Sequence, residues 1–324
     1  MNAIETNSLT KKFDELAAVD SVNLEIMEGE MFGLLGPNGA GKTTTISMLA
    51  TMLEPTSGSA KINGFDIRNK DNVRKSIGIV FQDPSLDDEL TGKENLEFHA
   101  RMYHMQKNLR EKRTEEVLKL VELEDKANQR VKTYSGGMKR RLEIARGLMH
   151  HPKILFLDEP TLGLDPQTRR SIWEHIRRLN KQEKITIILT THYMEEAEYL
   201  CNRIAIIDHG KIIALDTPDN LKNIMGGDIL TLETDNAEEL KKILKFEWIK
   251  EIKIFDSSMN IIVNNGEKVI PKILEIAGKN RIRIISVKLK KPTLEDVFIH
   301  YTGRAIREEE GSSLDKMRMR FRRG

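Results

Sequence analysis

The sequence has little of the chemistry that marks secreted or membrane-spanning proteins. Its 324 residues include a single cysteine, Cys201, so no disulfide can form within the chain, which suits a reducing cytosol. Residues 1–10 are polar and lack the apolar core of a signal peptide. No apolar run approaches the ~18 residues that cross a bilayer. If the protein serves transport, we expect the membrane pore to be another chain.

An excess of charge of either sign is also missing. The 52 basic and 50 acidic side chains leave a formal net charge of +2, which gives no general attraction to nucleic acid or anionic lipid. Aromatic residues are only 5% of the chain, whereas charged residues are 31%, a composition typical of helix-rich globular proteins. At ~150 residues per domain, the length predicts two domains.

Residues 1–225 have the pattern of an α/β domain. Short runs of alternating apolar and polar residues over 1–30, with a turn at Glu28-Gly29-Glu30, predict antiparallel strands. A helix is predicted from Lys42, because apolar side chains follow it at helical spacing. Compact apolar runs predict further strands, several of them in a parallel sheet, at 31–35, 76–81, 154–157, 185–189 and 203–208.

A helical stretch interrupts this pattern at about 88–150. Thr91-Gly-Lys-Glu94 is a capping box, which predicts a helical region running to about Leu123. Ser135 is a good N-cap for a further helix. Because strands resume at Ile154, we interpret the stretch as an inserted helical subdomain.

The remaining chain predicts a second, smaller domain after Gly226-Gly227. Its strand–helix–strand–strand–helix–strand order over 228–303 predicts a ferredoxin-like α+β fold. A short helix is predicted from Thr293. The tail, 304–324, is rich in basic residues and is predicted to be flexible.

A glycine-rich segment between the strand at 31–35 and the helix from Lys42 satisfies the Walker A pattern. Its backbone N–H groups and the helix dipole predict a phosphate-binding loop. Lys42 is expected to reach the β- and γ-phosphates of ATP, and the Thr43 hydroxyl to ligate Mg²⁺. A simple connecting turn is the alternative. The predicted nucleotide-binding residues are Gly36, Pro37, Asn38, Gly39, Ala40, Gly41, Lys42, Thr43 and Thr44.

Two acids end the apolar strand at 154–157. Asp158 is placed to hold Mg²⁺, directly or through water. Glu159 is placed to orient or deprotonate an attacking water. The alternative is a pair of solvated acids at a strand edge, and the phosphate loop upstream favours the catalytic interpretation.

Tyr134-Ser-Gly-Gly-Met138 resembles the signature motif of ABC ATPases, and it lies upstream of the Asp158 strand as in that family. Ser135, Gly136 and Gly137 begin a helix with free N–H donors and a hydroxyl, which makes a second anion site. The resemblance implies that this site caps the γ-phosphate of ATP held by a partner copy, in a head-to-tail homodimer. Tyr134 and Met138 replace the commoner Leu and Gln without removing these donors.

Four further residues are assigned by the same resemblance. Gln82 looks like the Q-loop glutamine, which senses Mg²⁺ and faces the membrane partner. His192 looks like the switch histidine that contacts the γ-phosphate. Asp165, in Gly163-Leu-Asp165, looks like part of the D-loop at the dimer interface. Phe13 occupies the place of the aromatic residue that stacks on adenine, with a core phenylalanine as its alternative.

The C-terminal part is similar to a narrower branch. Lys291-Pro-Thr-Leu-Glu-Asp-Val-Phe298, with Tyr301-Thr-Gly303, resembles the end of the daunorubicin-resistance type of drug-export ATPases. Residues 82–87 and 90–96 also look like that branch. The resemblance implies a homodimer that powers a separate multi-span permease from the cytoplasmic face of the membrane, with drugs or other hydrophobic, lipid-like compounds as cargo. The permease is expected to dock near residues 82–103.

Two other functions remain open from the sequence. Soluble ABC ATPases that act on ribosomes carry two cassettes, and those that organise chromosomes carry a long coiled coil. This chain has one cassette, no such coil and no basic footprint, so we expect no nucleic-acid partner. In an assembly or regulatory scaffold, the 228–303 domain would bind a small ligand; support of the dimer is the alternative role for that domain.

Overall fold

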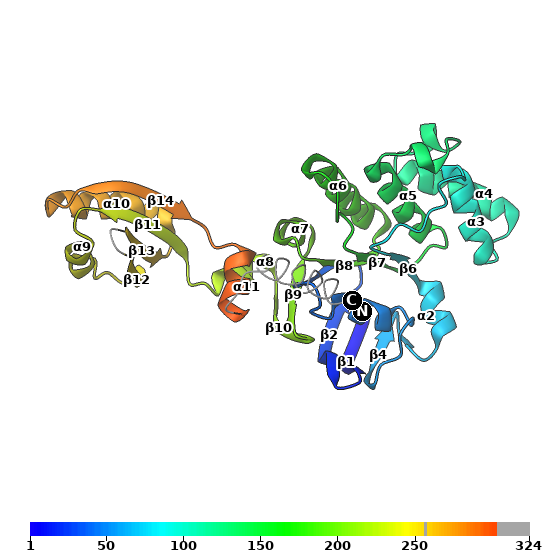
Figure 1. The fold of residues 1–324 in the computed structure, drawn as a ribbon, viewed down its shortest axis with the longest axis horizontal. Coiled ribbons are helices and arrows are strands. Elements are labelled where there is room, and N and C mark those ends of the chain that lie inside the picture. The colour runs from blue at the N-terminus through cyan, green and yellow to red at the C-terminus, as the bar shows by residue number, and fades with distance from the viewer. Residues whose placement is uncertain (256–257, 303–324) are drawn as a thin grey trace, which may run out of the picture. The chain divides into compact units, whose positions relative to one another are not determined.

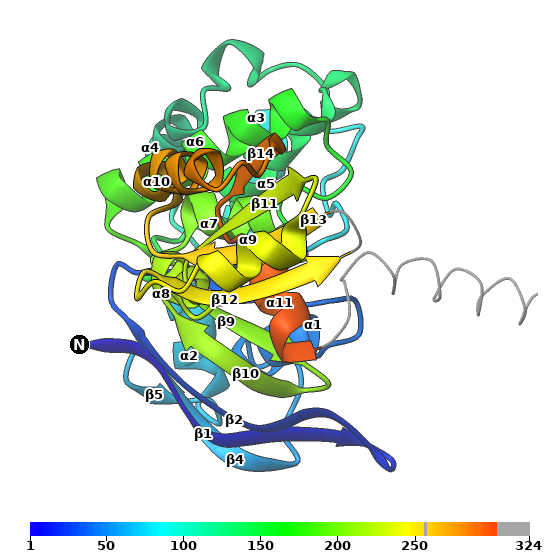
Figure 2. The ribbon, with the colours of Figure 1, turned by 90° about the vertical axis from the view of Figure 1, so that its left-hand side faces the viewer.

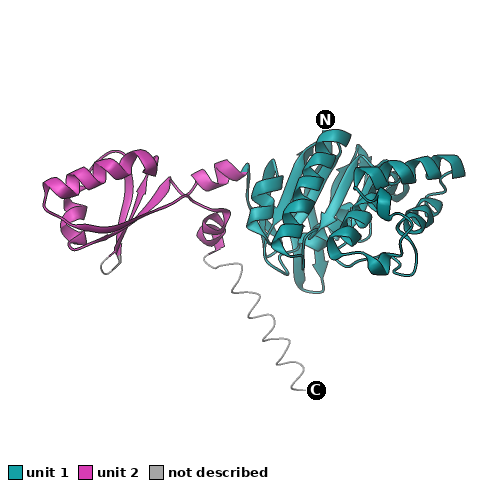
Figure 3. Cartoon of the chain, turned by 90° about the horizontal axis from the view of Figure 1, so that it is seen from above, with its two compact units in different colours: residues 1–217, 306–324 teal, residues 218–305 magenta. Residues whose placement is uncertain are grey.

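The computed structural model describes residues 1–255 and 258–302. The described chain divides into two compact units, residues 1–217 and residues 218–302 (Figure 3). The division falls after Thr217, earlier in the chain than the Gly226-Gly227 turn. The basic tail at 304–324 lies outside the described residues.

The first unit is built around a six-stranded mixed sheet with the order β10-β9-β3-β8-β7-β6. Neighbouring strands are parallel except β9 and β10, which form an antiparallel hairpin at one edge. Strands β3, β7 and β8 are buried along their whole length, as expected for parallel strands covered on both faces. The bounds are β3 Met31–Leu35, β6 Ile77–Val80, β7 Ile154–Asp158, β8 Thr186–Thr191, β9 Arg203–Asp208 and β10 Lys211–Asp216.

A second, antiparallel sheet lies on one side of the first and has the order β2-β1-β4-β5. The predicted antiparallel N-terminal strands are confirmed, and the pair β4-β5, with helix α2 after it, adds to them. The bounds are β1 Asn2–Phe13, β2 Leu16–Met27, β4 Ser57–Ile62, β5 Phe65–Asp66 and α2 Lys70–Ser76.

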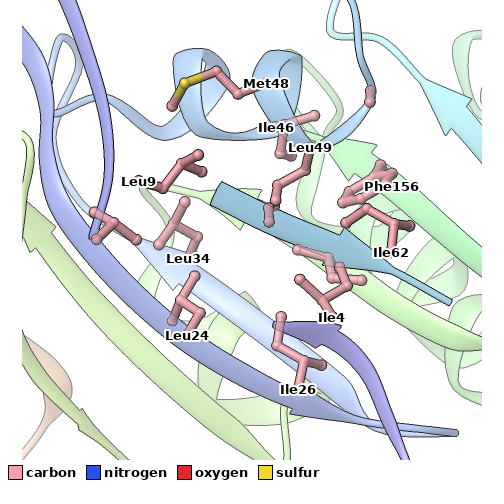
Figure 4. Close-up of a cluster of buried hydrophobic side chains, with 14 of the residues drawn as sticks. Ile4, Leu9, Leu24, Ile26, Leu34, Ile46, Met48, Leu49, Ile62 and Phe156 are labelled. Atoms are coloured by element: carbon pink, nitrogen blue, oxygen red, sulfur yellow. The ribbon is translucent and has the colours of Figure 1, made fainter. Parts of the chain in front are cut away.

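Helix α1 (Lys42–Leu49) lies between the two sheets. Its side chains Ile46 and Leu49 belong to one apolar cluster with Leu9 of the antiparallel sheet and Phe156 of β7 (Figure 4). Each such side chain contributes roughly 1.5–3 kcal/mol when fully buried. The helix is therefore held from both sides, which fixes the position of its N-terminus.

Helices α6 (Pro166–Glu183) and α7 (Met194–Leu200) cover the opposite face of the six-stranded sheet (Figure 1). Asp165 caps α6 and Pro166 occupies its first turn, a position that proline favours. The buried stripe of α6 includes Ile172 and Ile176 at helical spacing. Within the described residues, no helix is both long and apolar enough to span a membrane.

The inserted helical subdomain contains α3 (Gly92–Met102), α4 (Lys107–Leu120) and α5 (Gly136–Leu148). The capping box of α3 is present, with the Glu94 N–H donating to Thr91 Oγ1 at 3.2 Å. The helical region predicted up to about Leu123 is present and consists of two helices, because the chain turns between α3 and α4 at His104, where φ is +55°. Figure 1 shows these helices gathered beyond β6.

The second unit contains a four-stranded antiparallel sheet with the order β12-β13-β11-β14, which is the ferredoxin-like arrangement. Helices α9 and α10 share one apolar core with the sheet, which includes Leu230, Leu240 and Ile273 (Figure 2). The bounds are α8 Pro218–Asn223, β11 Asp228–Thr234, α9 Ala237–Ile243, β12 Ile249–Phe255, β13 Ser258–Val263, α10 Gly266–Lys279, β14 Ile284–Lys290 and α11 Leu294–Thr302.

Gly33, in the centre of β3, is required by the close approach of Cys201 at the end of α7. A Cβ added at Gly33 would lie 2.7 Å from Cys201 Sγ, well inside van der Waals contact. The cysteine is buried and is not disulfide-bonded. Its place in the fold is therefore that of a small side chain packed against a backbone without one.

Gly33→Ala should destabilise the protein by ~1–3 kcal/mol through overpacking. Adding Cys201→Ala removes the sulfur that the new methyl group meets, so the double variant should be more stable than the sum of the two single effects predicts. Urea unfolding of the four proteins measures this coupling. Additive effects would show that the two positions do not share space.

Candidate functional site

The phosphate loop curls tightly between β3 and α1. Gly41, the N-cap of α1, has φ +104°, and a Cβ there would lie 2.3 Å from the Ala18 carbonyl oxygen. Only glycine suits this conformation and this approach. No side chain caps the N-terminus of α1, so its N–H groups and the positive end of its dipole are directed to the loop.

Lys42 lies inside the loop and is 5% exposed. Its ammonium donates to the carbonyl oxygens of Gly36 at 2.9 Å and Pro37 at 3.0 Å, and lies 3.4 Å from Glu159 Oε1. Burial lowers the pKa of Lys42 below its ordinary value, and the Glu159 and Asp158 carboxylates oppose this shift only in part. A further anion beside the ammonium would stabilise its charged form.

Asp158, at the end of β7, faces the first turn of α1. Its Oδ1 accepts hydrogen bonds from Thr43 Oγ1 at 3.3 Å and from Thr190 Oγ1 of β8. The hydroxyl and carboxylate oxygens therefore converge at the carboxyl end of the parallel strands. Hard cations such as Mg²⁺ prefer oxygen ligands of this kind, so the residues present fit the ion.

Glu159 follows Asp158 and adopts φ +46°, an uncommon conformation for a residue with a side chain. Its N–H donates to the Thr190 carbonyl oxygen at 3.1 Å. Its carboxylate lies between Lys42 and His192, whose Nδ1 is 3.3 Å from Oε2. Burial favours the neutral acid, but the hydrogen bond from His192 and the charge of Lys42 outweigh it and hold the pKa of Glu159 below its ordinary value.

One cavity of about 340 Å³ brings many of the predicted residues together. It joins the phosphate loop to the ends of three strands of the sheet. Gly36, Pro37 and Ala40 belong to the loop but do not line the cavity, and Asp158 reaches it through Thr43. The lining residues are Ala18, Asn38, Gly39, Gly41, Lys42, Thr43, Thr44, Gln82, Glu159, Leu162 and His192.

Phe13 and the signature residues do not line this cavity. Phe13 ends β1 and is 47% exposed, so the alternative of a core phenylalanine is wrong. The Lys11 ammonium lies 5.3 Å from the centre of the Phe13 ring. The ring is thus available on the surface of the antiparallel sheet.

The signature segment and Asp165 lie next to each other. Ser135 caps α5, with its Oγ accepting from the Met138 N–H at 3.2 Å. A Cβ at Gly137 would lie 2.7 Å from Thr168 Cγ2 in the first turn of α6. Asp165 caps α6 through the Thr168 N–H at 3.0 Å, and its hydrogen bonds with Thr168 hold the pKa of Asp165 low.

Glu196 and Thr190 take part in the site, although no sequence motif pointed to them. Glu196 of α7 is fully buried, and its Oε1 accepts from Thr161 Oγ1 and Trp173 Nε1, each at 2.8 Å. Burial raises the pKa of Glu196. Its spacing of four residues from the apolar Leu200 was the available signal for a buried face. For Thr190, the available signal was a hydroxyl side chain near the carboxyl end of a buried strand, beside the strand that ends in Asp158.

Tyr134 shows how the departure from the common signature is accommodated. Its ring is buried, and its hydroxyl donates to the Lys126 carbonyl oxygen at 2.7 Å. The hydroxyl also lies where a side chain at Gly92 would be. The tyrosine therefore braces the signature segment against the start of α3 and leaves Ser135 as the helix cap.

This combination defines the class of the protein. A phosphate loop before α1, paired acids after β7, a capped glycine-rich helix start at α5 and an inserted helical subdomain together make an ABC-type ATP-binding cassette. Comparison with known proteins agrees. The model of the ABC transporter family matches residues 19–162, and the model of the DrrA1-3-like ATP-binding protein C-terminal domain matches residues 217–302.

Similar proteins cover nearly the whole chain. The linearmycin resistance ATP-binding protein LnrL of Bacillus subtilis is 38% identical, over 94% of this chain and 100% of its own length. The daunorubicin resistance ATP-binding protein DrrA2 of Streptomyces coeruleorubidus is 36% identical, over 95% and 97%. The Nod factor export ATP-binding protein I of Rhizobium etli is 38% identical, over 94% and 95%. The chain belongs to the ABC transporter ATP-binding protein family, in the branch with a DrrA-like C-terminal domain.

Solved structures resemble the cassette. The dimeric, post-hydrolysis ATP-binding cassette MJ0796 with ADP and phosphate matches with a TM-score of 0.59 and 32% identity, over 66% of this chain and 98% of that one. The protein cbiO1 of Clostridium perfringens, part of the ABC transporter complex cbiONQ, matches with a TM-score of 0.64 and 28% identity, over 75% of this chain and 94% of that one. The chain binds and hydrolyses ATP, as its family does.

Gly41→Ala should abolish most ATP binding, because the new methyl group displaces the loop from the Ala18 carbonyl. Gly64→Ala is the matched control: Gly64 also has a positive φ, +79°, but a Cβ there meets nothing within 4 Å. Both changes carry the backbone cost of ~1–2 kcal/mol for a side chain in the left-handed region. Titration with a fluorescent ATP analogue separates them, and equal affinities in the two variants would contradict the steric argument.

Proposed function

We propose that this chain is the ATP-hydrolysing subunit of an exporter, acting as one half of a homodimer that drives a separate multi-span permease. The observation that carries the proposal is the single cavity in which the phosphate loop meets Gln82, Glu159 and His192. The cassette and the DrrA-like C-terminal domain occur together in relatives named for drug resistance and Nod factor export.

The loop and Lys42 bind the phosphates of ATP. The N–H groups before α1 and the buried ammonium supply positive potential in a confined site, where it acts strongly. Thr43, Asp158 and Gln82 would hold Mg²⁺ through oxygen ligands, Asp158 directly or through water. The ion, when bound, offsets negative charge on the phosphates.

Glu159 orients and deprotonates the attacking water. Its pKa, lowered by His192 and Lys42, keeps the carboxylate ionised and able to accept a proton at neutral pH. His192, 3.3 Å from that carboxylate, contacts the γ-phosphate and holds Glu159 in place. Positioning of this kind accounts for most of the catalysis in phosphoryl transfer.

The second half of each site comes from the partner copy, arranged head to tail. The N-terminus of α5 offers the Ser135 hydroxyl and the N–H groups of Gly136 and Gly137 as an anion site that lies outside the chain's own cavity. Asp165, beside that helix start, contacts the partner across the interface. A dimeric state of the related cassette MJ0796 supports this assembly.

The permease docks on the helical subdomain near residues 82–103. Three large side chains of α3 and its end are exposed there, Phe98 at 62%, Met102 at 65% and Tyr103 at 37%. Such a patch suits the apolar face of a helix from the permease. Through the permease the chain is held at the cytoplasmic face of the membrane. Its near-neutral charge favours this role over one on nucleic acid.

The cargo we infer is a drug or another hydrophobic, lipid-like compound. The names of these relatives refer to linearmycin resistance, daunorubicin resistance and Nod factor export, and the relatives match 94–95% of this chain. The proposal of export therefore depends on similarity to these relatives, whereas ATP hydrolysis is also supported by the residues around the phosphate loop.

Glu159→Gln should lower turnover by about 10²–10⁴-fold, because the water loses its base. ATP binding should persist, and the variant should accumulate as an ATP-bound dimer. Phosphate release measures the first effect, and light scattering after size exclusion with ATP measures the second. Glu195→Gln, an exposed acid on α7, is the control and should behave as the parent. Near-parental turnover by Glu159→Gln would contradict the assignment of Glu159 as the residue that deprotonates the attacking water.

The double variant Phe98→Glu, Met102→Glu should lose its membrane partner. Two carboxylates on the patch make its burial against an apolar helix costly. Co-purification from detergent-solubilised membranes, with identification of multi-span proteins, measures the loss. Leu109→Glu, an equally polar change at an exposed residue of α4, should keep the partner. Retention of the permease by both variants would place docking elsewhere.

A further inference from the structure

Arg140 of α5 is a buried arginine directly behind the catalytic acids. It is 6% exposed, and it donates to four backbone carbonyl oxygens from two separate segments. Nε donates to Pro160 at 2.7 Å, Nη2 to Asp158 at 3.0 Å and to Glu159 at 3.2 Å, and Nη1 to Phe81 at 2.6 Å. The planar guanidinium of one side chain therefore joins the end of β7 to Phe81, the residue that precedes Gln82.

The carbonyls that Arg140 holds belong to the peptide groups on both sides of Glu159. The Asp158 carbonyl is in the peptide group before Glu159, and the Glu159 carbonyl is in the one after it. Because φ of Glu159 is +46°, its conformation persists only where the surroundings fix it. Arg140 holds the peptide planes on both sides of Glu159. These planes set the direction in which the Glu159 side chain points from the backbone.

The same face of α5 also contacts the segment after Gln82, up to Ser85. Glu143, which pairs with Arg140 Nη1 at 2.9 Å, accepts from the Ser85 N–H at 2.9 Å. Arg146, three residues on, donates to the Ser85 carbonyl oxygen at 2.7 Å. Residues spaced by three thus form one stripe of α5 that holds residues 81–85 at both ends.

The helix that carries this stripe begins at the signature segment. Any movement of α5 would therefore be felt by the segments that contain Gln82 and Glu159, because the same guanidinium contacts both. The guanidinium of arginine offers five N–H donors in a fixed plane, whereas the lysine ammonium offers three donors from one rotatable nitrogen and cannot reach all four carbonyls in this arrangement.

We propose that Arg140 is a positioning residue for ATP hydrolysis. It keeps Gln82 and Glu159 in fixed positions relative to each other and to helix α5, which begins at the signature segment. The proposal rests on the functions given above to Glu159 and Gln82. It differs from a stabilising role alone, since a buried arginine that merely supports the fold has no reason to affect turnover more than binding.

The test compares Arg140→Gln and Arg140→Lys with Arg113→Gln in the full-length chain. Arg113 of α4 is the matched control: it is 5% exposed and donates to the Leu148 carbonyl oxygen at 2.9 Å, at the other end of α5. ATP affinity, kcat and the Mg²⁺ concentration for half-maximal turnover are measured for each variant, with thermal unfolding as the measure of folding.

Arg140→Gln is expected to bind ATP as the parent does, to lose on the order of 10²-fold in kcat, the scale of a 1 Å misplacement, and to need more Mg²⁺. Arg140→Lys, which keeps the buried charge and much of the volume, should fold and show the same split to a smaller extent. Arg113→Gln should lower the melting temperature and leave kcat and the Mg²⁺ requirement near those of the parent.

Parental kcat and Mg²⁺ dependence in Arg140→Lys, or equal losses in the Arg140 and Arg113 variants, would overturn the proposal. Arg140→Lys decides the matter if Arg140→Gln does not fold. Glu159→Gln distinguishes failure of the catalytic role proposed for Glu159 from failure of the positioning role proposed for Arg140. If it still hydrolyses ATP, the proposed catalytic role fails; if it stops turnover while Arg140→Lys is unimpaired, only the role of Arg140 fails.

Discussion

The pairing of the buried Lys42 ammonium with the Glu159 carboxylate is the interaction around which the first unit is arranged. Both groups are less than a tenth exposed, and they lie 3.4 Å apart. Neither charge could be buried alone without a large desolvation cost. The pair exists only because the loop before α1 and the end of β7 meet at one edge of the sheet. That meeting in turn depends on α1 being packed between two sheets.

The polar contacts behind this pair form a continuous layer. Thr190 bonds to Asp158 and to the Glu159 backbone, Arg140 holds the carbonyls on either side, and Glu196 connects the following Thr161 to α6. Each of these side chains is buried and makes at least one hydrogen bond to another part of the layer, and buried polar contacts of this kind add rigidity to a core. The chemistry in the cavity thus rests on groups that do not themselves face it.

Much of this was predictable from local pattern. The apolar runs correctly predicted β3, β7, β8 and β9. The glycines before Lys42 predicted the phosphate loop, because backbone geometry fixes the spacing of glycines in such a loop. The break at His104 was not predictable, since residues 91–123 read as one helical stretch. Arg140 was hidden for a similar reason: in a run of three basic residues on a helix, only tertiary contacts decide which one turns inward. Glu196 was missed because its partners lie 23 and 35 positions away.

The left-handed backbone at Glu159 has a consequence for the history and engineering of this chain. Glycine or asparagine would suit that conformation better than glutamate does. The left-handed backbone therefore favours replacement of the acid, whereas the buried charge of Lys42 opposes it, so two opposite effects on stability meet at this position. A library scored by melting temperature would report the sum of these two effects and would not detect a loss of turnover. Screens for improved variants need an activity threshold applied before any ranking by stability.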